Sequence, residues 1–147
     1  MEEKHFQEGM RTHENIIYAC FGCLSNTGIT AGLGSLEAVK ELGLEKVAVG
    51  CLASLPLGVA PVIAKTKAAK NVITVDGCPF ECSRKTVEAA GFKPAKSIML
   101  VRDIGMKKKA LHEDIGGDLK PLMDYVSSED VEKTKRLLVK TIKGEEG

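Results

Sequence analysis

The chain has 147 residues, of which 44% are apolar and 28% are charged, and its formal net charge is +1. This length suits one domain with one core, and near neutrality gives no strong attraction to nucleic acid or to an anionic membrane. No apolar run approaches the roughly 18 residues that a membrane span needs, and the N-terminus lacks the basic start and apolar stretch of a signal peptide. We therefore expect no nucleic-acid partner, no membrane segment and a cytoplasmic location.

Strands and helices are predicted in alternation along the first half of the chain. Residues 1–15 are polar and are interpreted as an N-terminal extension, and an apolar strand is expected at 16–20. A helix should then run to about residue 42, because apolar residues recur at helical spacing; these are Leu33, Leu36, Val39 and Leu42. Gly43 is a plausible end for this helix. The next expected elements are a strand at about 46–51 and a helix from about 59 to 70.

The second half of the chain begins with the most apolar predicted strand. Residues 71–76 are nearly all apolar, as expected for a strand that is buried on both faces. A helix at about 82–90 and a strand at about 97–102 follow. Residues 104–127 contain several glycines and a proline and are interpreted as mostly loop. A last helix is expected at about 128–142, with Ser128 as its N-cap.

This order of elements predicts an α/β fold. Right-handed crossovers would produce a three-layer, Rossmann-like parallel sheet of about four strands, with flanking helices and a C-terminal helix. Strand order 2-1-3-4 is the default for the pattern. We expect a single domain over 1–147, with the α/β core and the cysteine site in 16–103 and a loop and C-terminal helix in 104–147.

The cysteines give the clearest functional signal. Three predicted strands end on Cys20, Cys51 and Cys78, and Cys82 follows closely. In a parallel sheet these ends share the edge at which open α/β sheets bind ligands. Thiols stay reduced in the cytoplasm, and an odd total of five leaves no complete set of internal disulfides. The cluster therefore indicates a metal site or thiol chemistry.

Zinc is the metal expected at this edge, since soft thiolates bind it well, although they also bind iron and copper. The favoured ligands are Cys20, Cys51, Cys78 and Cys82, with Cys23 as a spare or substitute. The alternative is that some of these residues are only small buried hydrophobic side chains.

The segment from Val75 to Cys82, Val-Asp-Gly-Cys-Pro-Phe-Glu-Cys, together with Cys20, resembles the DGC-domain family of zinc-binding proteins. The family is named for the tripeptide seen here as Asp76-Gly77-Cys78. Segments 51–53, 87–91 and 103–108 also resemble it, so that the likeness covers about 16–110. The resemblance implies zinc binding by Cys20, Cys51, Cys78 and Cys82. It implies no reaction, and Cys23 is not a general feature of the family.

Two spacings keep a thiol enzyme open as the alternative. Cys20-Phe21-Gly22-Cys23 has the C-x-x-C spacing of thiol oxidoreductases. Cys78 and Arg84 have the C-x5-R spacing of cysteine phosphatases, in which arginine holds an oxyanion. Pro79 argues against the second interpretation, because it removes an N–H from the expected oxyanion cradle. Whether the chain is an enzyme stays open.

Asp76 and the histidines have less specific interpretations. Asp76 could accept a hydrogen bond from a metal ligand or act as a general base, but a cap of the following turn is favoured. The histidines, which lie outside the predicted strand ends, are expected on the surface; they are His5, His13 and His112.

Overall fold

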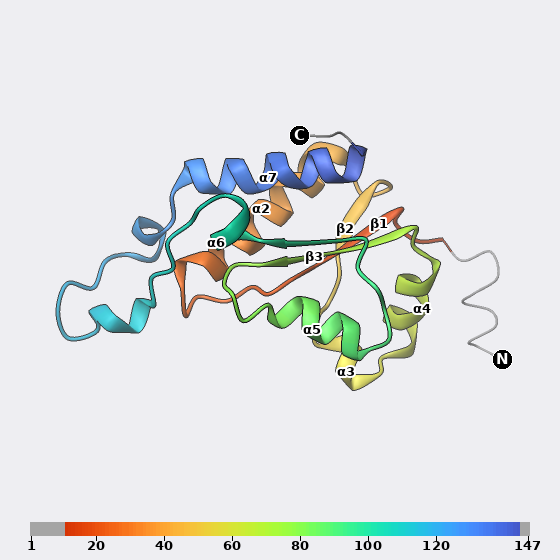
Figure 1. Ribbon diagram of the computed structural model, residues 1–147, viewed down its shortest axis with the longest axis horizontal. Coiled ribbons are helices and arrows are strands. Elements are labelled where there is room, and N and C mark those ends of the chain that lie inside the picture. Colours follow the sequence, from red (N-terminus) through yellow and green to blue (C-terminus); the bar gives the residue numbers. More distant parts are fainter. Residues whose placement is uncertain (1–10, 145–147) are drawn as a thin grey trace.

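The computed structural model describes residues 11–144, and its elements alternate between strands and helices as far as the last strand (Figure 1). In chain order the elements are β1 (Asn15–Ala19), α2 (Asn26–Leu42), β2 (Val47–Val49), α3 (Ser54–Leu57), α4 (Ala60–Ala68), β3 (Asn71–Asp76), α5 (Cys82–Ala89), β4 (Lys96–Met99), α6 (Leu100–Asp103), η1 (Leu111–Asp114), η2 (Leu122–Tyr125) and α7 (Ser128–Lys143). The predicted extension at 1–15 lies mostly outside the described residues.

The four strands form one parallel sheet in the order β2-β1-β3-β4. The two central strands are β1 and β3, and Ile17 of β1 lies opposite Val49 of β2 and Ile73 of β3. All strand ends therefore meet at the same edge of the sheet. The predicted α/β class, the parallel sheet and the order 2-1-3-4 are confirmed.

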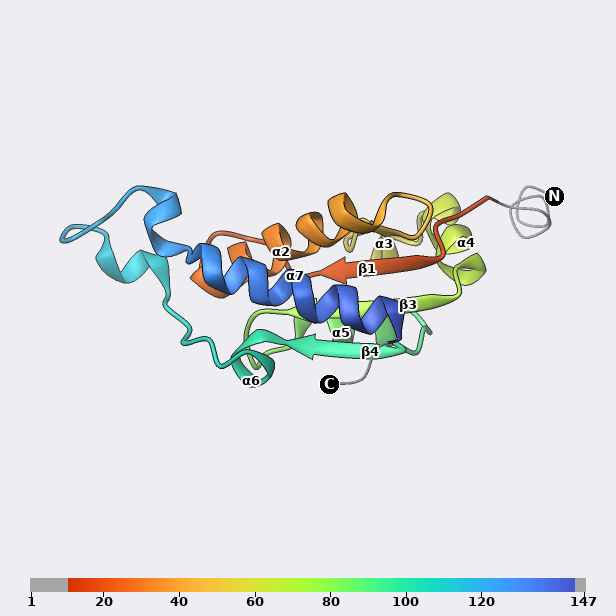
Figure 2. The ribbon, with the colours of Figure 1, turned by 90° about the horizontal axis from the view of Figure 1, so that it is seen from above.

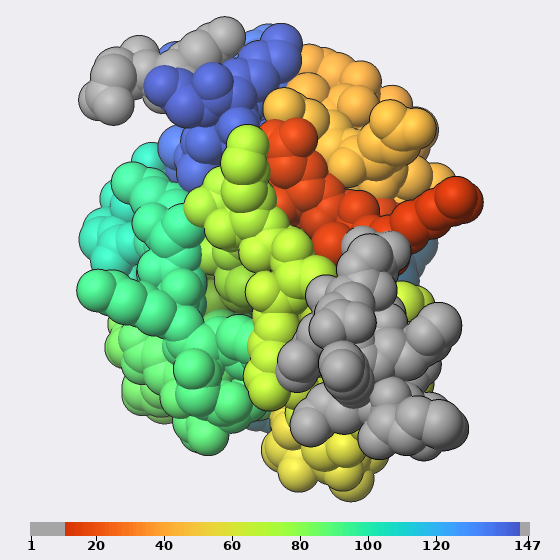
Figure 3. Space-filling model, turned by 90° about the vertical axis from the view of Figure 1, so that its right-hand side faces the viewer, coloured from red at the N-terminus to blue at the C-terminus, as the bar shows by residue number. Residues whose placement is uncertain are grey.

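Helices cover both faces of the sheet, which gives three layers (Figure 1), and Figure 2 looks down on the face that carries α2 and α7. Helices α2 and α7 lie together on one face, and α3, α4 and α5 lie on the other (Figure 1). Figure 3 views the end of the molecule at which the strands begin, with α2 and α7 on one side of β1 and β3 and α3 on the other. Apolar strands covered in this way bury side chains on both faces.

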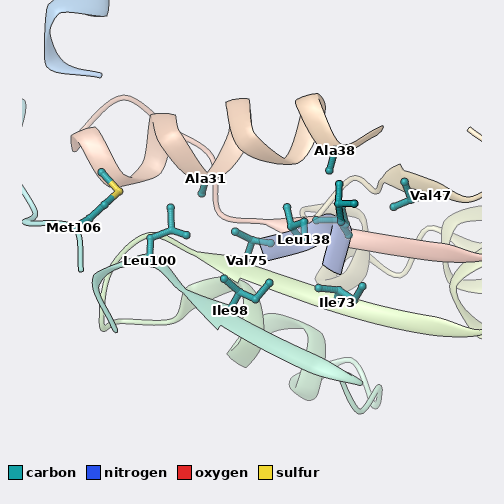
Figure 4. Packing of buried hydrophobic residues seen from close by; sticks show 11 residues of the cluster. Ala31, Ala38, Val47, Ile73, Val75, Ile98, Leu100, Met106 and Leu138 are labelled. Atoms are coloured by element: carbon teal, nitrogen blue, oxygen red, sulfur yellow. The ribbon is translucent and has the colours of Figure 1, made fainter. Parts of the chain in front are cut away.

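Two apolar clusters stabilise the packing of helices on the two faces of the sheet. The larger lies under α2 and α7, where Ile17, Ile73 and Val75 pack with Leu138 of α7 (Figure 4). The smaller lies on the opposite face; its buried members are Ile16, Tyr18, Leu55, Val72 and Val87. Neighbouring strand residues thus contribute to opposite clusters, as the pleat requires.

Helix α2 ends at Leu42 as predicted, but its buried face differs from the expected one. Leu36 is 50% exposed, whereas small residues such as Ala31 and Ala38 are fully buried. An added Cβ at Gly34 would lie 2.4 Å from the Thr134 methyl group of α7. Small residues therefore allow the close approach of α7, which a pattern of large apolar residues does not predict.

The helix expected at about 59–70 is α4, and a further short helix that was not predicted, α3, precedes it. Gly58 has a left-handed backbone with φ of 69°, and its N–H closes α3 on the carbonyl groups of Leu55 and Ser54. Helix α4 then starts at Ala60 with proline in its first turn, where the missing N–H has no helical partner to lose.

Two further boundaries differ from those predicted. The strand expected at 97–102 ends at Met99, because the Asp103 carboxylate accepts the Met99 N–H at 2.9 Å and residues 100–103 form a helical turn. The N-cap of α7 is Ser127 and not Ser128, since the Ser127 hydroxyl accepts the Asp130 N–H. Among residues 11–144, no helix combines the length and the apolar character needed to cross a bilayer.

Candidate functional site

Cys20 directly follows β1. Its N–H donates to the carbonyl oxygen of Val75 at 3.0 Å, so that the pairing of β1 with β3 extends to this residue. The Cys20 thiol is half-buried. The backbone of β1 and β3 therefore holds this sulfur at the carboxyl edge of the sheet, beside the turn that carries Cys78 and Cys82.

The thiols of Cys78 and Cys82 are close enough to that of Cys20 to raise its pKa. The pKa of the Cys20 thiol is raised from 9.0 to about 11, first by burial and then by the charges of Cys82, Asp76 and Cys78 and by a hydrogen bond with Cys82. Each of these causes disfavours the thiolate. Two distant parts of the chain thus bring three of the five sulfurs together at one edge.

The turn between Cys78 and Cys82 leads directly into α5, which begins at Cys82. The Glu81 N–H donates to the Cys78 carbonyl oxygen at 3.2 Å, and Glu81 has a left-handed backbone with φ of 51°. Such a backbone is uncommon for a residue other than glycine and folds the chain back sharply. As a result, Cys82 occupies the first residue of α5, where its side chain is exposed.

Asp76 caps this helix from the end of β3. Its carboxylate is 2% exposed and accepts the N–H groups of Ser83 at 2.7 Å and Arg84 at 3.1 Å. N–H groups in the first turn of a helix have no partner within the helix, and a carboxylate there also suits the helix dipole. The interpretation of Asp76 as a cap is confirmed.

Gly77 is required by a close approach of two backbones. An added Cβ at this position would lie 2.5 Å from the carbonyl carbon and oxygen of Thr27, at the start of α2. A real Cβ atom does not come so close to backbone atoms without a shift. The Asp-Gly-Cys tripeptide therefore combines a helix cap, a contact that excludes a side chain, and a thiol.

Cys51 lies in a different environment at the end of β2. It is exposed and contributes to a pocket of about 160 Å³ with Tyr18 and Thr66. The buried Tyr18 hydroxyl is 2.6 Å from the Thr66 hydroxyl, and its pKa is raised first by burial and also by the charge of Cys51. Gly50 allows this arrangement, since a Cβ there would meet the Tyr18 ring at 2.6 Å.

The remaining candidates are not among the groups that raise the pKa of Cys20. Cys23 is exposed in the loop before α2, and His112 is exposed in η1. The Nδ1 atom of His13 is 2.5 Å from the Leu44 carbonyl oxygen, and this residue lines the Cys51 pocket. His5 lies outside the described residues.

Arg84 forms ion pairs with two carboxylates. Its guanidinium donates to both Glu81 oxygens at 3.1 and 3.2 Å and to Glu88 at 2.9 Å, and these neighbours raise its pKa. Planar two-point pairing of this kind is the preferred geometry of arginine with carboxylate. The guanidinium is therefore paired along α5, in an arrangement that the C-x5-R spacing alone does not predict.

The donor atoms at the edge fit zinc by their chemistry. Three thiols near one another are soft ligands of the kind that zinc prefers. Within residues 11–144, however, no three His, Cys, Asp or Glu side chains already surround a point at which a metal ion could sit. Coordination by these thiols therefore requires rotation of side chains, above all that of the exposed Cys82.

The sequence patterns identified Asp76 as a cap but missed the ion pairs of Arg84 and the neighbourhood of Cys51 and Tyr18. The pairing of Arg84 with Glu81 and Glu88 follows i, i+3 and i, i+4 spacings, which were a readable signal. Cys51 and Tyr18 line the same pocket, and the only residue in the sequence that could have indicated this is Gly50, which leaves room for the Tyr18 ring.

Comparison with known proteins gives one match. The profile of the DGC domain family matches residues 16–137, which extends the sequence likeness beyond residue 110 and into α7. Searches of curated proteins and of solved structures found no match.

Proposed function

This chain belongs to the DGC domain family, and we propose that it is a zinc-binding protein whose metal is held by cysteine thiolates at the carboxyl edge of its sheet. The observation that carries the proposal is the closeness of the Cys78 and Cys82 thiols to the half-buried Cys20 thiol, whose pKa they raise. Burial and the nearby negative charges disfavour the thiolate form of Cys20. A bound divalent cation would favour the thiolates, because its charge neutralises theirs.

The proposed ligands begin with the three thiols that interact. Cys20, Cys78 and Cys82 supply three sulfurs, and Cys51 is the expected fourth ligand. Because Cys51 lies beside Tyr18, its recruitment requires a local change after β2. Cys23 is the substitute if Cys51 keeps its present position. A closed four-sulfur site would be structural, whereas three sulfurs with an open position would suit transfer of the metal.

The alternative of a thiol enzyme has weaker support. An attacking thiol in a redox or transfer reaction needs a lowered pKa, and the pKa of Cys20 is raised to about 11. An oxyanion at Cys78 would need the Arg84 guanidinium, which is paired with Glu81 and Glu88. Both features favour a metal site over a nucleophile.

The cellular setting of the proposal follows from the same chemistry. Reduced, metal-binding thiols suit the cytoplasm, where disulfides rarely persist. The net charge of +1 supports neither nucleic acid nor an anionic membrane as a partner. The metal ion itself is the proposed partner.

Elemental analysis of protein purified without chelator tests the proposal. We expect about one zinc per chain, as a single tetrahedral site requires. Cys82→Ser should remove most of the zinc, because the variant loses an exposed proposed ligand and the residue does not support the core. Cys23→Ser is the matched control, since Cys23 is also exposed, and its zinc content should stay unchanged when Cys51 is the fourth ligand.

The zinc content of the cysteine variants identifies the fourth ligand and tests the ligand set. Loss of zinc in Cys51→Ser but not in Cys23→Ser would support Cys51, and the opposite pattern would support Cys23. A protein that binds no zinc after reduction and incubation with zinc would refute the proposal. Retention of zinc in Cys82→Ser together with its loss in Cys23→Ser would refute the ligand set.

A further inference from the structure

A long ordered segment projects beyond the sheet edge that carries the cysteines. Figures 1 and 2 both show residues 111–125 extending away from the body of the molecule, past the ends of the strands. We call this segment the arm. Connections of such length are uncommon in compact domains and often have a function of their own.

Polar contacts hold the arm in one shape. The Tyr125 hydroxyl donates to the Asp114 carboxylate at 2.6 Å and accepts the Lys120 N–H at 3.1 Å. Lys109 pairs with Glu113 and Asp114 at the base. The arm is therefore organised before any binding, which lowers the entropy that binding would cost.

The arm exposes large apolar side chains along its length. The exposed residues, with their exposed fractions, are Ile115 (70%), Leu119 (60%), Leu122 (48%) and Met123 (56%). Single exposed apolar residues are ordinary, but a group on one projection typically marks an interaction site.

A second apolar surface lies at the base of the arm. Leu24 is 84% exposed and Phe80 is 65% exposed. The Leu24 carbonyl oxygen accepts the Leu111 N–H, and the Lys108 ammonium lies 4.7 Å from the centre of the Phe80 ring. We call Leu24, Phe80, Lys107 and Lys108 the edge surface; it adjoins the turns that carry the clustered thiols.

The charges of the two surfaces are opposite. On the arm, Asp118 and Asp124 are exposed, and neither has an ion-pair partner within residues 11–144. On the edge surface, Lys107 and Lys108 are exposed, and they too have no carboxylate partner within that range. The arm also carries the exposed Lys120, whose ammonium lies 5.6 Å from the centre of the Tyr125 ring, but its carboxylates outnumber this cation. A net acidic, apolar arm thus matches a basic, apolar edge surface.

We propose that the arm binds the edge surface of a second copy of this chain, so that two copies form a two-fold dimer. Both surfaces lie at the same end of the molecule, so each copy can offer its arm and receive the other. Such a reciprocal contact closes with two copies, whereas surfaces at opposite ends would produce open chains of molecules. The arms would then cover the edge at which Cys20, Cys78 and Cys82 meet.

Each copy would contribute both its arm and its edge surface to this contact, with six large apolar side chains that are 48% to 84% exposed. A standard interface buries roughly 800 Å² on each partner, to which these side chains and their polar neighbours would contribute. Polar neighbours on both surfaces can complete the rim of such an interface.

Analytical ultracentrifugation of the full chain over a range of concentrations tests the proposal. We expect a monomer–dimer equilibrium that is present with zinc and also with chelator, because the interface does not use the metal. Leu119→Glu with Met123→Glu should weaken dimerisation at least about tenfold, since it places charges in the apolar contact. Leu44→Glu is the control: Leu44 is 63% exposed but precedes β2 at the other end of the sheet, so dimerisation should not change.

Charge reversal separates recognition from a general effect on folding. Asp118→Lys with Asp124→Lys should weaken the dimer, and Lys107→Glu with Lys108→Glu should also weaken it. All four changes in one chain should restore dimerisation, because each surface again meets its opposite charge. Circular dichroism and the melting temperature would verify that each variant is folded.

Three results would overturn the proposal. They are a wild-type chain that stays monomeric at all concentrations, a dimer that the arm variants leave unchanged, and assemblies that grow beyond two copies as concentration rises. Zinc binding could fail while the dimer persists, or the reverse, so this test and that of zinc binding are independent.

Discussion

The Ser83 N–H donates to the buried Asp76 carboxylate at 2.7 Å, which joins the end of β3 to the first turn of α5. The same carboxylate accepts the Arg84 N–H, so that one side chain satisfies two helix N–H groups. The position of Cys82, at the start of the same turn, depends on this cap.

Replacement of Asp76 by alanine should lower the free energy of unfolding by about 1–3 kcal/mol, because two N–H groups lose their acceptor in a buried setting. Chemical denaturation of the metal-free protein would measure this loss. Asp76→Asn is the matched variant; its one carbonyl oxygen can keep a single bond, so its loss should be intermediate. Equal stability of Asp76→Ala and wild type would contradict the assigned cap.

Replacement of Gly77 by alanine should also destabilise the fold. The added methyl group would lie 2.5 Å from the Thr27 backbone, and overpacking of this kind typically costs about 1–3 kcal/mol. Gly117→Ala is the control, because its Cβ would meet only the Asp114 carbonyl oxygen at 3.8 Å, an ordinary contact. Thermal denaturation of both variants would measure the difference, and similar losses in the two would count against a specific clash at Gly77.

Alkylation of the metal-free protein at neutral pH should be slow at Cys20. The pKa of Cys20 is raised to about 11, so at neutral pH little of its thiol is in the reactive thiolate form. Peptide mapping after brief treatment with iodoacetamide should show Cys20 labelled far more slowly than the exposed Cys23. The Cys20 rate should keep rising until the pH approaches about 11. Equal rates at neutral pH would contradict the assigned environment.

The same pKa predicts a change in stability at alkaline pH. A folded-state pKa of about 11 against an ordinary 9.0 means that the folded protein holds the Cys20 proton more tightly. The resulting stabilisation is fully present below about pH 9 and is lost as pH rises through about 11. Urea denaturation of the metal-free chain should show this decline, and Cys20→Ser should show less of it.

Replacement of Arg84 by methionine should leave zinc binding intact. In the described structure Arg84 contacts Glu81 and Glu88 on the partly exposed side of α5, and exposed ion pairs contribute little to stability. We expect a small drop in melting temperature and an unchanged zinc content by elemental analysis. Loss of zinc in this variant would mean that Arg84 acts at the thiol cluster after all.

The alternation of apolar strands and helices was sufficient to predict the sheet and its order. The two central strands, β1 and β3, are apolar enough to be buried on both faces, and this property can be read locally along the chain. The end of β4 could not be read in this way, because it depends on a hydrogen bond from Met99 to the Asp103 side chain. The face of α2 was missed for a related reason: Gly34 is buried through its contact with Thr134, which comes from a distant helix.

The candidate site was predictable in part. The parallel order brought Cys20 to the same edge as Cys78 and Cys82, since strand ends share an edge whatever their separation in sequence. The position of Cys51 followed from side-chain packing, in which the large Tyr18 ring occupies the space beside Gly50. The pairing of Arg84 was likewise decided by carboxylates one turn away on either side.

The hydrogen bond from the Cys20 N–H to Val75 means that the thiols can come together only after β1 and β3 have paired. Cys20 leaves the ribosome early, yet its sulfur meets those of Cys78 and Cys82 only after β3 has been made and has docked beside β1. A nascent chain that ends before this strand has no gathered thiols to offer. Any ion acquired at this edge is therefore acquired late, by a chain whose central strands are already paired.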